Sequence, residues 1–509
     1  MRKILLLFFV SLFFFILHSR LISSNYLTFS DPAKLADIAR NITSFREYVT
    51  NFTFFDPQLF EKGGPVFASW VPPLMPLSIA ISFTTLGISD FSVKITSGVF
   101  YLLLVISVFL LGKKIYGETA GFFAALAVAA NPNFLDYATS GASETLFAFE
   151  IVLAAYLFIL GKKRANVFGF LVLILMYFTR PQAIIYLFGF LLLFFLLNLP
   201  IKKALSYFSV AFVLGSAIYL LFSKQGLFAV TQHLPGVAPS DALRGGTLEA
   251  GILPISKKIF YNLYNFYRLL PQIMSPYLWA LFIIGLFKWG KDRVENSFKL
   301  ATVFTVTVTF LVTALTIPFF RYLHPVVPLV YILGVATLVW IISKFARGRF
   351  VSLISATLIF IFVVGQTLGV IFLDSRFKAK TVNKEKPPVY VVLSRILKEN
   401  TDPENVIVTN LDTWGSWYGE RRTVWYPLKP EQLDLKDTQN PFDVIFLTNY
   451  LMDDENYYMN EGWRQIFENP KSPKDEFIAK NYKFAGEFKV PPDETYEKQE
   501  GRAILLVRK

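Results

Sequence analysis

Long apolar stretches recur through the first 373 residues, and they constrain the fold more than any other feature of the sequence. A helix that crosses a bilayer needs about 20 predominantly apolar residues. The chain is 54% hydrophobic and contains 54 Phe among its 509 residues. We therefore expect a polytopic α-helical membrane protein. Eleven spans are predicted, near residues 1–22, 92–111, 119–135, 144–160, 165–179, 182–198, 204–223, 276–290, 298–318, 324–343 and 350–373.

The basic residues predict how these spans are oriented. The net charge is +13, but the chain from Asp374 onward holds 21 Lys/Arg against 23 Asp/Glu, so the surplus lies among the spans. Basic residues between spans are topology signals, and we do not expect a nucleic-acid partner. Six clusters, which include Arg2/Lys3 and Lys113/Lys114, fall on one side if residues 72–87 form a re-entrant or interfacial helix. That side is predicted to be cytoplasmic, with the N-terminus on it.

The N-terminal stretch and the lack of cysteine bound the chemistry further. Residues 1–22 resemble a signal peptide, but no small-x-small cleavage site follows, so an uncleaved first span is expected. The chain contains no Cys, which excludes disulfides and thiolate metal sites.

The residues from 374 to 509 differ in character from the rest and are predicted to form a soluble α/β domain on the outer side. Residues 397–412 have the pattern of a helix, a turn and a strand, and 443–449 and 502–509 that of buried strands. We recognise no glycine-rich phosphate loop, metal-binding pattern or catalytic triad in this tail. The expected division is a membrane domain, 1–373, followed by an extracytoplasmic domain.

Two acidic residues lie at predicted outer edges of the membrane. Asp31, before Pro32, opens an amphipathic stretch in the first outer loop (23–71), and Glu144 opens an apolar helix. Helix capping or a favourable helix dipole explains such acids. Alternatively, they line a membrane cavity, where acids serve proton transfer or bind a divalent metal. Asp37, farther along the same stretch, is expected at the edge of this site, in contact with substrate or solvent.

Basic residues interrupt apolar runs on the same predicted face. Arg180 lies in MYFTRPQAIIY, and Arg321 lies in IPFFRYLHPVVP beside Tyr322 and His324. Each arginine is either a snorkelling anchor or a phosphate ligand, because a guanidinium binds phosphate oxygens in a bidentate way.

The long outer loop, 224–275, carries further basic side chains. A loop of this length favours a covering or substrate-binding role over a simple connection. Its candidates are His233, Arg244, Lys257, Lys258 and Arg268. In the tail, Trp414, Trp417 and Trp425 are expected to pack in a core rather than to line a sugar site.

The order of several short motifs resembles that of the GT-C superfamily of membrane glycosyltransferases. The nearest group is family 39, which includes the protein O-mannosyltransferases and the lipid A aminoarabinose transferase. The resemblance covers about residues 1–345. Its motifs are Asp31 to Arg40, Pro72-Pro73-Leu74, Leu86 to Phe91, Gly112 to Gly117, Asn131 to Glu144, Thr179 to Pro181 and Arg321 to Pro325.

The resemblance implies a GT-C fold and a defined reaction. A sugar would pass, with inversion, from a polyprenyl-phosphate donor to a hydroxyl of a lipid, glycan or protein on the outer face. No cofactor is required, although a divalent metal on Asp31 and Glu144 is possible. Asp31 matches the catalytic carboxylate of the first loop and Glu144 the second acidic position. Arg180, Arg321, His324, Lys257 and Arg268 would bind the donor phosphate, and Asp37, Tyr322 and His233 the substrate.

Two departures and two rivals stand beside this interpretation. Pro32 follows Asp31 where many members have Glu, and Val71 precedes the PPL motif where Lys is frequent. The oligosaccharyltransferase branch has a W-W-D-Y-G motif, and the nearest stretch here, Trp414 to Gly419, lacks the central Asp. A transporter of lipid-linked sugars without catalysis is the other rival, but we find no inverted repeat in the sequence.

Overall fold

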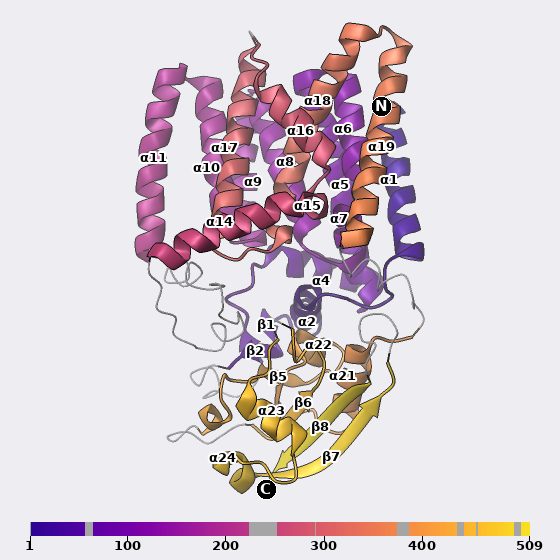
Figure 1. The fold of residues 1–509 in the computed structure, drawn as a ribbon, viewed down its shortest axis with the longest axis vertical. Helices are drawn as coiled ribbons and strands as arrows, with labels where there is room; N and C mark the ends of the chain where they lie inside the picture. The colour runs from indigo at the N-terminus through magenta and orange to yellow at the C-terminus, as the bar shows by residue number, and fades with distance from the viewer. Residues whose placement is uncertain are drawn as a thin grey trace.

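The computed structural model describes residues 2–55, 65–222, 252–290, 292–373, 386–434, 442–454, 457–492 and 500–509. Figure 1 shows a bundle of long helices with an α/β domain at one end of it. The N-terminus lies at the end of the bundle that points away from this domain, and the C-terminus lies at the domain's far tip (Figure 1). The chain is thus a polytopic helical protein with a C-terminal α/β domain, as the sequence predicted.

Helices occur at all eleven stretches that were predicted to span the membrane. They are α1 (Arg2–Leu21), α5 (Asp90–Tyr116), α6 (Glu118–Ala129), α7 (Pro132–Ser140), α8 (Glu144–Ile159), α9 (Lys163–Thr179), α10 (Ala183–Asn198), α11 (Ile201–Phe222), α16 (Pro276–Leu286), α17 (Arg293–Leu315), α18 (Val327–Phe345) and α19 (Arg349–Leu373). Within the described residues, five helices are long and apolar enough to cross a membrane alone, or six if the bent pair α7 and α8 is one span. Length and composition therefore do not establish the predicted number of eleven.

The stretch 119–135 differs from the single helix that the sequence predicted. Helix α6 ends at Ala129, and Asn131 then caps α7, since its side chain accepts bonds from the amides of Asn133 and Phe134. Pro132 at the first position of α7 favours this restart. Helix α7 and helix α8 meet at a bend of 120° around Gly141, whose φ is +86°. The bend sets the direction in which α8, and Glu144 at its start, leaves the turn.

Shorter helices lie across the end of the bundle that faces the α/β domain (Figure 1). They are α2 (Ser30–Phe45), α4 (Leu74–Leu86), α14 (Ile252–Arg268) and α15 (Leu270–Ile273), followed by the 3-10 turns η1 (Phe320–Tyr322) and η2 (His324–Val326). Helix α4 has 13 residues, too few to cross a bilayer of ordinary thickness. This agrees with the re-entrant or interfacial helix predicted over 72–87.

Helices α5 and α6 pack tightly beside the turn that joins them. A Cβ atom added to Gly112 would lie 2.8 Å from the Cα of Gly121, so the two backbones approach as closely as glycine allows. Small residues at such crossings permit the close helix contacts that hold membrane bundles together.

The α/β domain is built on a six-stranded sheet in the order β2-β5-β4-β6-β8-β7. Strands β2, β5, β4 and β6 pair in parallel, and β8 and β7 are antiparallel. The strands are β2 (Phe52–Phe54), β4 (Val406–Thr409), β5 (Arg422–Trp425), β6 (Val444–Thr448), β7 (Tyr482–Val490) and β8 (Gly501–Arg508). The helices are α21 (Val389–Glu399), α22 (Asp412–Trp417), α23 (Glu461–Glu468) and α24 (Glu476–Asn481), with a 3-10 turn at η3 (Pro430–Leu433).

The strands predicted from the tail are confirmed as β4, β6 and β8, whereas β5 and β7 were not predicted. Strand β2 comes from the first outer loop and pairs with β5, so the sheet crosses the sequence boundary between the two predicted domains. A small hairpin, β1 (Val49–Thr50) with β3 (Val66–Phe67), lies next to β2 in the same loop.

Candidate active site

Asp31 does not cap its helix. The N-cap of α2 is Phe29, and no side chain accepts a capping hydrogen bond there. The Asp31 carboxylate instead forms two ion pairs. Its Oδ2 lies 2.6 Å from Nη1 of Arg321, and its Oδ1 lies 2.9 Å from Nζ of Lys34. Lys34 lies one turn farther along α2, whereas Arg321 comes from η1, 290 residues away. The acid of the first outer loop is therefore paired with a cation that lies close to it in space but far from it in the sequence.

Glu144 and Arg180 form a second ion pair beside the first. Arg180 directly follows α9, and its Nη1 lies 2.7 Å from Oε1 of Glu144 at the start of α8. The two side chains are only 12% and 4% exposed. The same nitrogen lies 3.2 Å from Oγ of Ser143. Arg180 is thus turned into the protein and does not snorkel towards solvent.

Tyr322 joins the two pairs. The guanidinium carbons of Arg180 and Arg321 lie 5.6 and 5.4 Å from the centre of its ring. We call Asp31, Glu144, Arg180 and Arg321 the four-charge cluster. The structure brings together all four residues to which the sequence gave the main roles, and they come from four separate stretches of the chain.

The electrostatics of the cluster favour an ionised acid. Burial opposes the charge on Asp31, but Lys34 and Arg321 outweigh it and hold the pKa of the Asp31 carboxyl well below its usual range. Asp31 raises the pKa of Lys34 in turn, against the effect of burial. Asp31 is therefore a fixed anion, ready to accept a hydrogen bond and weak as a base.

The C-terminal domain reaches this site through a residue that the sequence analysis did not single out. Asp412 opens α22 directly after strand β4, and its neighbour Thr413 donates from Oγ1 to the carbonyl of Ser30 at 2.5 Å. Burial raises the pKa of Asp412, although Lys34 opposes this. The sequence did contain a signal for Asp412, since it follows a predicted strand of the sheet. Binding sites in α/β sheets gather at the carboxyl ends of parallel strands.

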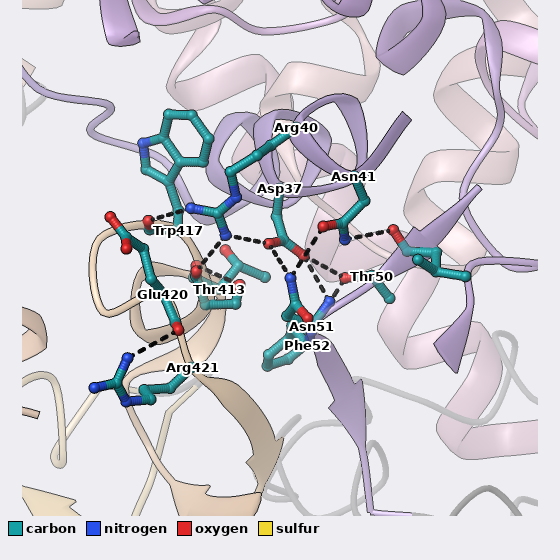
Figure 2. Close-up of polar contacts among 12 residues, drawn as sticks. Asp37, Arg40, Asn41, Thr50, Asn51, Phe52, Thr413, Trp417, Glu420 and Arg421 are labelled. Carbon is teal, nitrogen blue, oxygen red and sulfur yellow. Dashed lines mark hydrogen bonds and ion pairs between the residues drawn. The ribbon is translucent and has the colours of Figure 1, made fainter. Parts of the chain in front are cut away.

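Asp37 is buried between α2 and the loop that follows it, and its carboxylate is not open to a ligand. Oδ1 accepts from Nη2 of Arg40 at 2.6 Å and from the Asn51 side chain, and Oδ2 accepts from Oγ1 of Thr50 and the Asn51 amide. Figure 2 shows these bonds converging on the buried carboxylate. The residue that was predicted to bind substrate thus has both oxygens occupied by its own chain.

Arg40 continues this network into the C-terminal domain. Its guanidinium donates to the carbonyls of Ser416 and Trp417 at 2.8 and 3.0 Å and stacks over the Trp417 ring (Figure 2). Nε1 of Trp417 and the hydroxyl of Tyr418 donate to the two oxygens of Asp90, at 2.8 and 2.9 Å. The segment 414–419 therefore fastens the tail to the bundle.

The three tryptophans of the tail pack in cores, as the sequence favoured. Trp414, Trp417 and Trp425 are 3%, 7% and 7% exposed. Nε1 of Trp414 and the hydroxyl of Tyr390 both donate to the carbonyl of Leu27, in the linker that leads to α2.

The remaining predicted residues are not members of the four-charge cluster. His324 is buried, and its nitrogens bond to the Tyr137 hydroxyl and the Gln272 carbonyl, so both are engaged within the protein. Lys257 and Arg268 are exposed on α14, and Lys258 is buried there. His233 and Arg244 lie outside the described residues.

The acids of the cluster do not fit a resident divalent metal. Asp31 and Glu144 each face an arginine at 2.6 to 2.7 Å, so their charges are already neutralised. Within the described ranges, no group of three or more His, Cys, Asp or Glu side chains lies together in a way that would hold an ion.

Comparison with known proteins places the fold. Residues 70–225 match the family model described as dolichyl-phosphate-mannose-protein mannosyltransferase. A search among curated proteins finds no significant match.

Several solved membrane glycosyltransferases share the architecture. The oligosaccharyltransferase AglB of Archaeoglobus fulgidus, solved with an inhibitory peptide and a dolichol-phosphate, matches with a TM-score of 0.55 and 14% identity over 90% of this chain and 70% of its own. ArnT of Cupriavidus metallidurans, bound to undecaprenyl phosphate, matches with a TM-score of 0.52 and 12% identity over 98% and 97%. The mycobacterial arabinofuranosyltransferase AftD matches with a TM-score of 0.53 and 14% identity, over 99% of this chain and 41% of its own. The protein has the GT-C fold, as the order of its motifs predicted.

Proposed function

We propose that this GT-C protein is a glycosyltransferase that moves a sugar from a polyprenyl-phosphate donor to a hydroxyl of a lipid, glycan or protein. The observation that carries the proposal is the four-charge cluster, in which two arginines and two acids meet around Tyr322. The family model over residues 70–225 and the lipid phosphates bound by AglB and ArnT support the same donor class.

Arg321 is the cation best placed to receive the donor phosphate. Its side chain is 30% exposed, whereas that of Arg180 is 12% exposed and locked to Glu144. A phosphate oxygen that approaches Arg321 competes with Asp31 for the same guanidinium, which can bind in a bidentate way. Arg180 also lies against the Tyr322 ring and adds a second positive charge near the leaving phosphate.

Asp31, released from Arg321 but still held by Lys34, then faces the acceptor. It accepts a hydrogen bond from the hydroxyl, whose oxygen attacks the anomeric carbon as the bond to the phosphate oxygen breaks. The hydroxyl proton passes to the Asp31 carboxylate. Lys34 lowers the pKa of Asp31 more than Arg321 does, and it stays in place. The carboxylate therefore remains ionised while it orients the nucleophile, and it takes the proton late. A single displacement of this kind inverts the anomeric centre.

The orientation of the protein follows from where the site and the basic residues lie. The cluster is at the end of the bundle that bears the α/β domain, and Arg2, Lys3, Lys113 and Lys114 gather at the opposite end. Basic residues favour the cytoplasmic side. We therefore assign the site and the α/β domain to the outer face, and the N-terminus to the cytoplasm.

A direct test uses purified protein and a panel of polyprenyl-phosphate sugars. We expect release of free polyprenyl phosphate from one donor, faster when an extract that contains the acceptor is added. Arg321→Gln should raise the KM for that donor. If no donor is cleaved, but a labelled lipid-linked sugar crosses reconstituted bilayers, the protein is a transporter and the proposal fails.

Oligosaccharide transfer to a peptide is the second candidate, because AglB matches this chain over 90% of its length. The same assay separates the two if the panel includes a lipid-linked oligosaccharide and a peptide with an Asn-x-Thr sequence. Modification of the peptide's asparagine would contradict transfer to a hydroxyl.

A further inference from the structure

A cavity lies at the end of the bundle that points away from the α/β domain. It has a volume of about 660 Å³, and helices α1, α5, α6 and α8 supply its lining. Its polar lining is Arg2, Lys3, Lys113, Lys114, Glu118 and Tyr156. None of these residues belongs to the four-charge cluster, so the cavity is separate from the proposed active site.

The charges of this cavity do not balance. Glu118 is its single acid, and its oxygens lie 2.7 Å from Nζ of Lys3 and 3.3 Å from Nζ of Lys113. Arg2 and Lys114 have no ion-pair partner in the part of the chain that the structure describes. One carboxylate shared by two lysines thus leaves a surplus of positive charge around an open space, which favours an anionic ligand.

The other walls of the cavity are apolar. Phe109 is buried there, and Ile4 and Leu110 are half-buried. Helix α1 continues from this rim with Leu5, Leu6 and Phe9 exposed by 50% or more. Only 22% of the residues in the apolar window of α1 are buried in the protein, so most of this helix faces lipid. A ligand at the rim therefore meets cations at one end and a lipid-facing helix at the other.

We propose that this cavity binds the headgroup of an anionic phospholipid from the membrane leaflet at this end of the bundle. The phosphodiester would lie between Arg2 and Lys114, and the acyl chains would run along α1. Basic pockets between membrane helices suit anionic lipid headgroups, and arginine binds phosphate oxygens in a bidentate way.

The preference of basic residues for the cytoplasmic side explains cations at this end of the bundle, but it does not explain a cavity between them. Lys162 and Lys163 show the difference, because they are exposed at the start of α9 and do not line the cavity. They provide a matched control, with the same number of charges at another turn between membrane helices.

A bound lipid would also tie α1 to its neighbours. Lys3 and Lys113 already bridge α1 and α5 through Glu118 of α6. Helix α1 leads directly into the loop that carries Asp31, so the lipid would stabilise the segment on which the proposed active site depends.

The test is a titration of the purified full-length protein with phosphatidylglycerol in a detergent solution that contains excess phosphatidylcholine. Native mass spectrometry counts the retained lipid, and the melting temperature reports its stabilisation. We expect one tightly retained phosphatidylglycerol and a higher melting temperature. Arg2→Gln/Lys114→Gln should weaken binding by roughly thirtyfold, from about a fivefold loss per cation. Lys162→Gln/Lys163→Gln should leave it unchanged.

Three results would overturn the proposal. Equal weakening in the two double variants would mean that the whole basic end attracts lipid without a built site. Displacement of the lipid by millimolar inorganic phosphate would mean that the cavity takes a free anion. Retention of phosphatidylcholine at equal strength would mean that charge does not select the lipid. Each variant must show the monomer mass and the melting temperature of a folded protein before lipid is added.

Discussion

The two ion pairs of the cluster differ in exposure, and this difference separates their roles. Asp31 and Arg321 are 35% and 30% exposed, whereas Glu144 and Arg180 are 4% and 12% exposed. Solvent partly screens the first pair, so it stabilises the fold less than the buried pair does and is free to exchange partners with a substrate. The second pair is desolvated, and loss of one member leaves a buried charge behind.

Single and double substitutions test the buried pair. Glu144→Gln should destabilise the protein by about 3 kcal/mol, because Arg180 is left without its anion. Glu144→Gln/Arg180→Gln should recover much of that stability, but donor turnover should stay low if Arg180 acts on the phosphate. Melting temperatures and turnover of Glu144→Gln, Arg180→Gln and the double variant, each compared with wild type, complete the double-mutant cycle. Full activity of the stable double variant would remove Arg180 from the mechanism.

The pH dependence of stability tests the state of Asp31. Its folded pKa lies below the unfolded value of about 3.9. The ionised carboxylate therefore stabilises the fold above that value, and this contribution is lost as pH falls from there through the lower folded pKa. The difference in melting temperature between wild type and Asp31→Asn should stay constant from neutral pH down to about pH 4 and then shrink. A difference that fades already near pH 6 would contradict the assignment.

Much of the four-charge cluster could be predicted from the sequence, because the predicted topology placed its members on the same side of the membrane. Asp31, Glu144, Arg180 and Arg321 were assigned to one side by the basic clusters, and polar residues at the ends of adjacent spans meet. Asp412 was missed because its place next to α2, where its neighbour Thr413 bonds to Ser30, depends on how the tail docks, which no local pattern encodes. His324 and Asp37 were expected to meet ligands, but other groups of the protein occupy their polar atoms.

At the scale of elements, α2 is held between the bundle and the tail. Arg40 on α2 bonds to the carbonyls of Ser416 and Trp417, and the Tyr418 hydroxyl accepts from the Leu27 amide at 2.7 Å and donates to Asp90. Strand β2 joins the tail's sheet over three residues, too short a run for any periodicity to predict. The helix that carries Asp31 is thus positioned by the C-terminal domain.

Tyr418→Phe tests this positioning. It removes the hydroxyl that accepts from the Leu27 amide and donates to an Asp90 oxygen, at a cost of about 1 to 3 kcal/mol, and it should lower turnover by shifting α2. Tyr426→Phe is the matched control, since that hydroxyl bonds to the carbonyls of Tyr457 and Tyr458 within the tail. Both variants should lose stability, but only the first should change the KM for the acceptor. Equal kinetic effects would argue against specific positioning of α2.

For the whole molecule, the tail and the bundle form one functional unit. The sheet is completed by β2 from the first outer loop, and Asp412 of the tail lies beside the start of α2. The sequence predicted a helical membrane protein with a C-terminal α/β domain, but it could not show that the first outer loop contributes a strand to that domain's sheet.

Removal of residues 386–509 should therefore abolish turnover even if the bundle still inserts into membranes. The truncated protein should also expose α2 to protease, because α22 no longer covers it. Limited proteolysis followed by mass spectrometry measures this. A truncated protein that keeps its activity would show that the tail does not position the site.

The most direct test of the central claim is release of free polyprenyl phosphate by wild type and by Asp31→Asn. Asp453→Asn serves as the control, since Asp453 lies in the tail and is 75% exposed. We predict that wild type and the control release polyprenyl phosphate at equal rates. The rate for Asp31→Asn should be at least about a hundredfold lower. Equal release by all three proteins would contradict the claim that sugar transfer takes place at the Asp31–Arg321 pair.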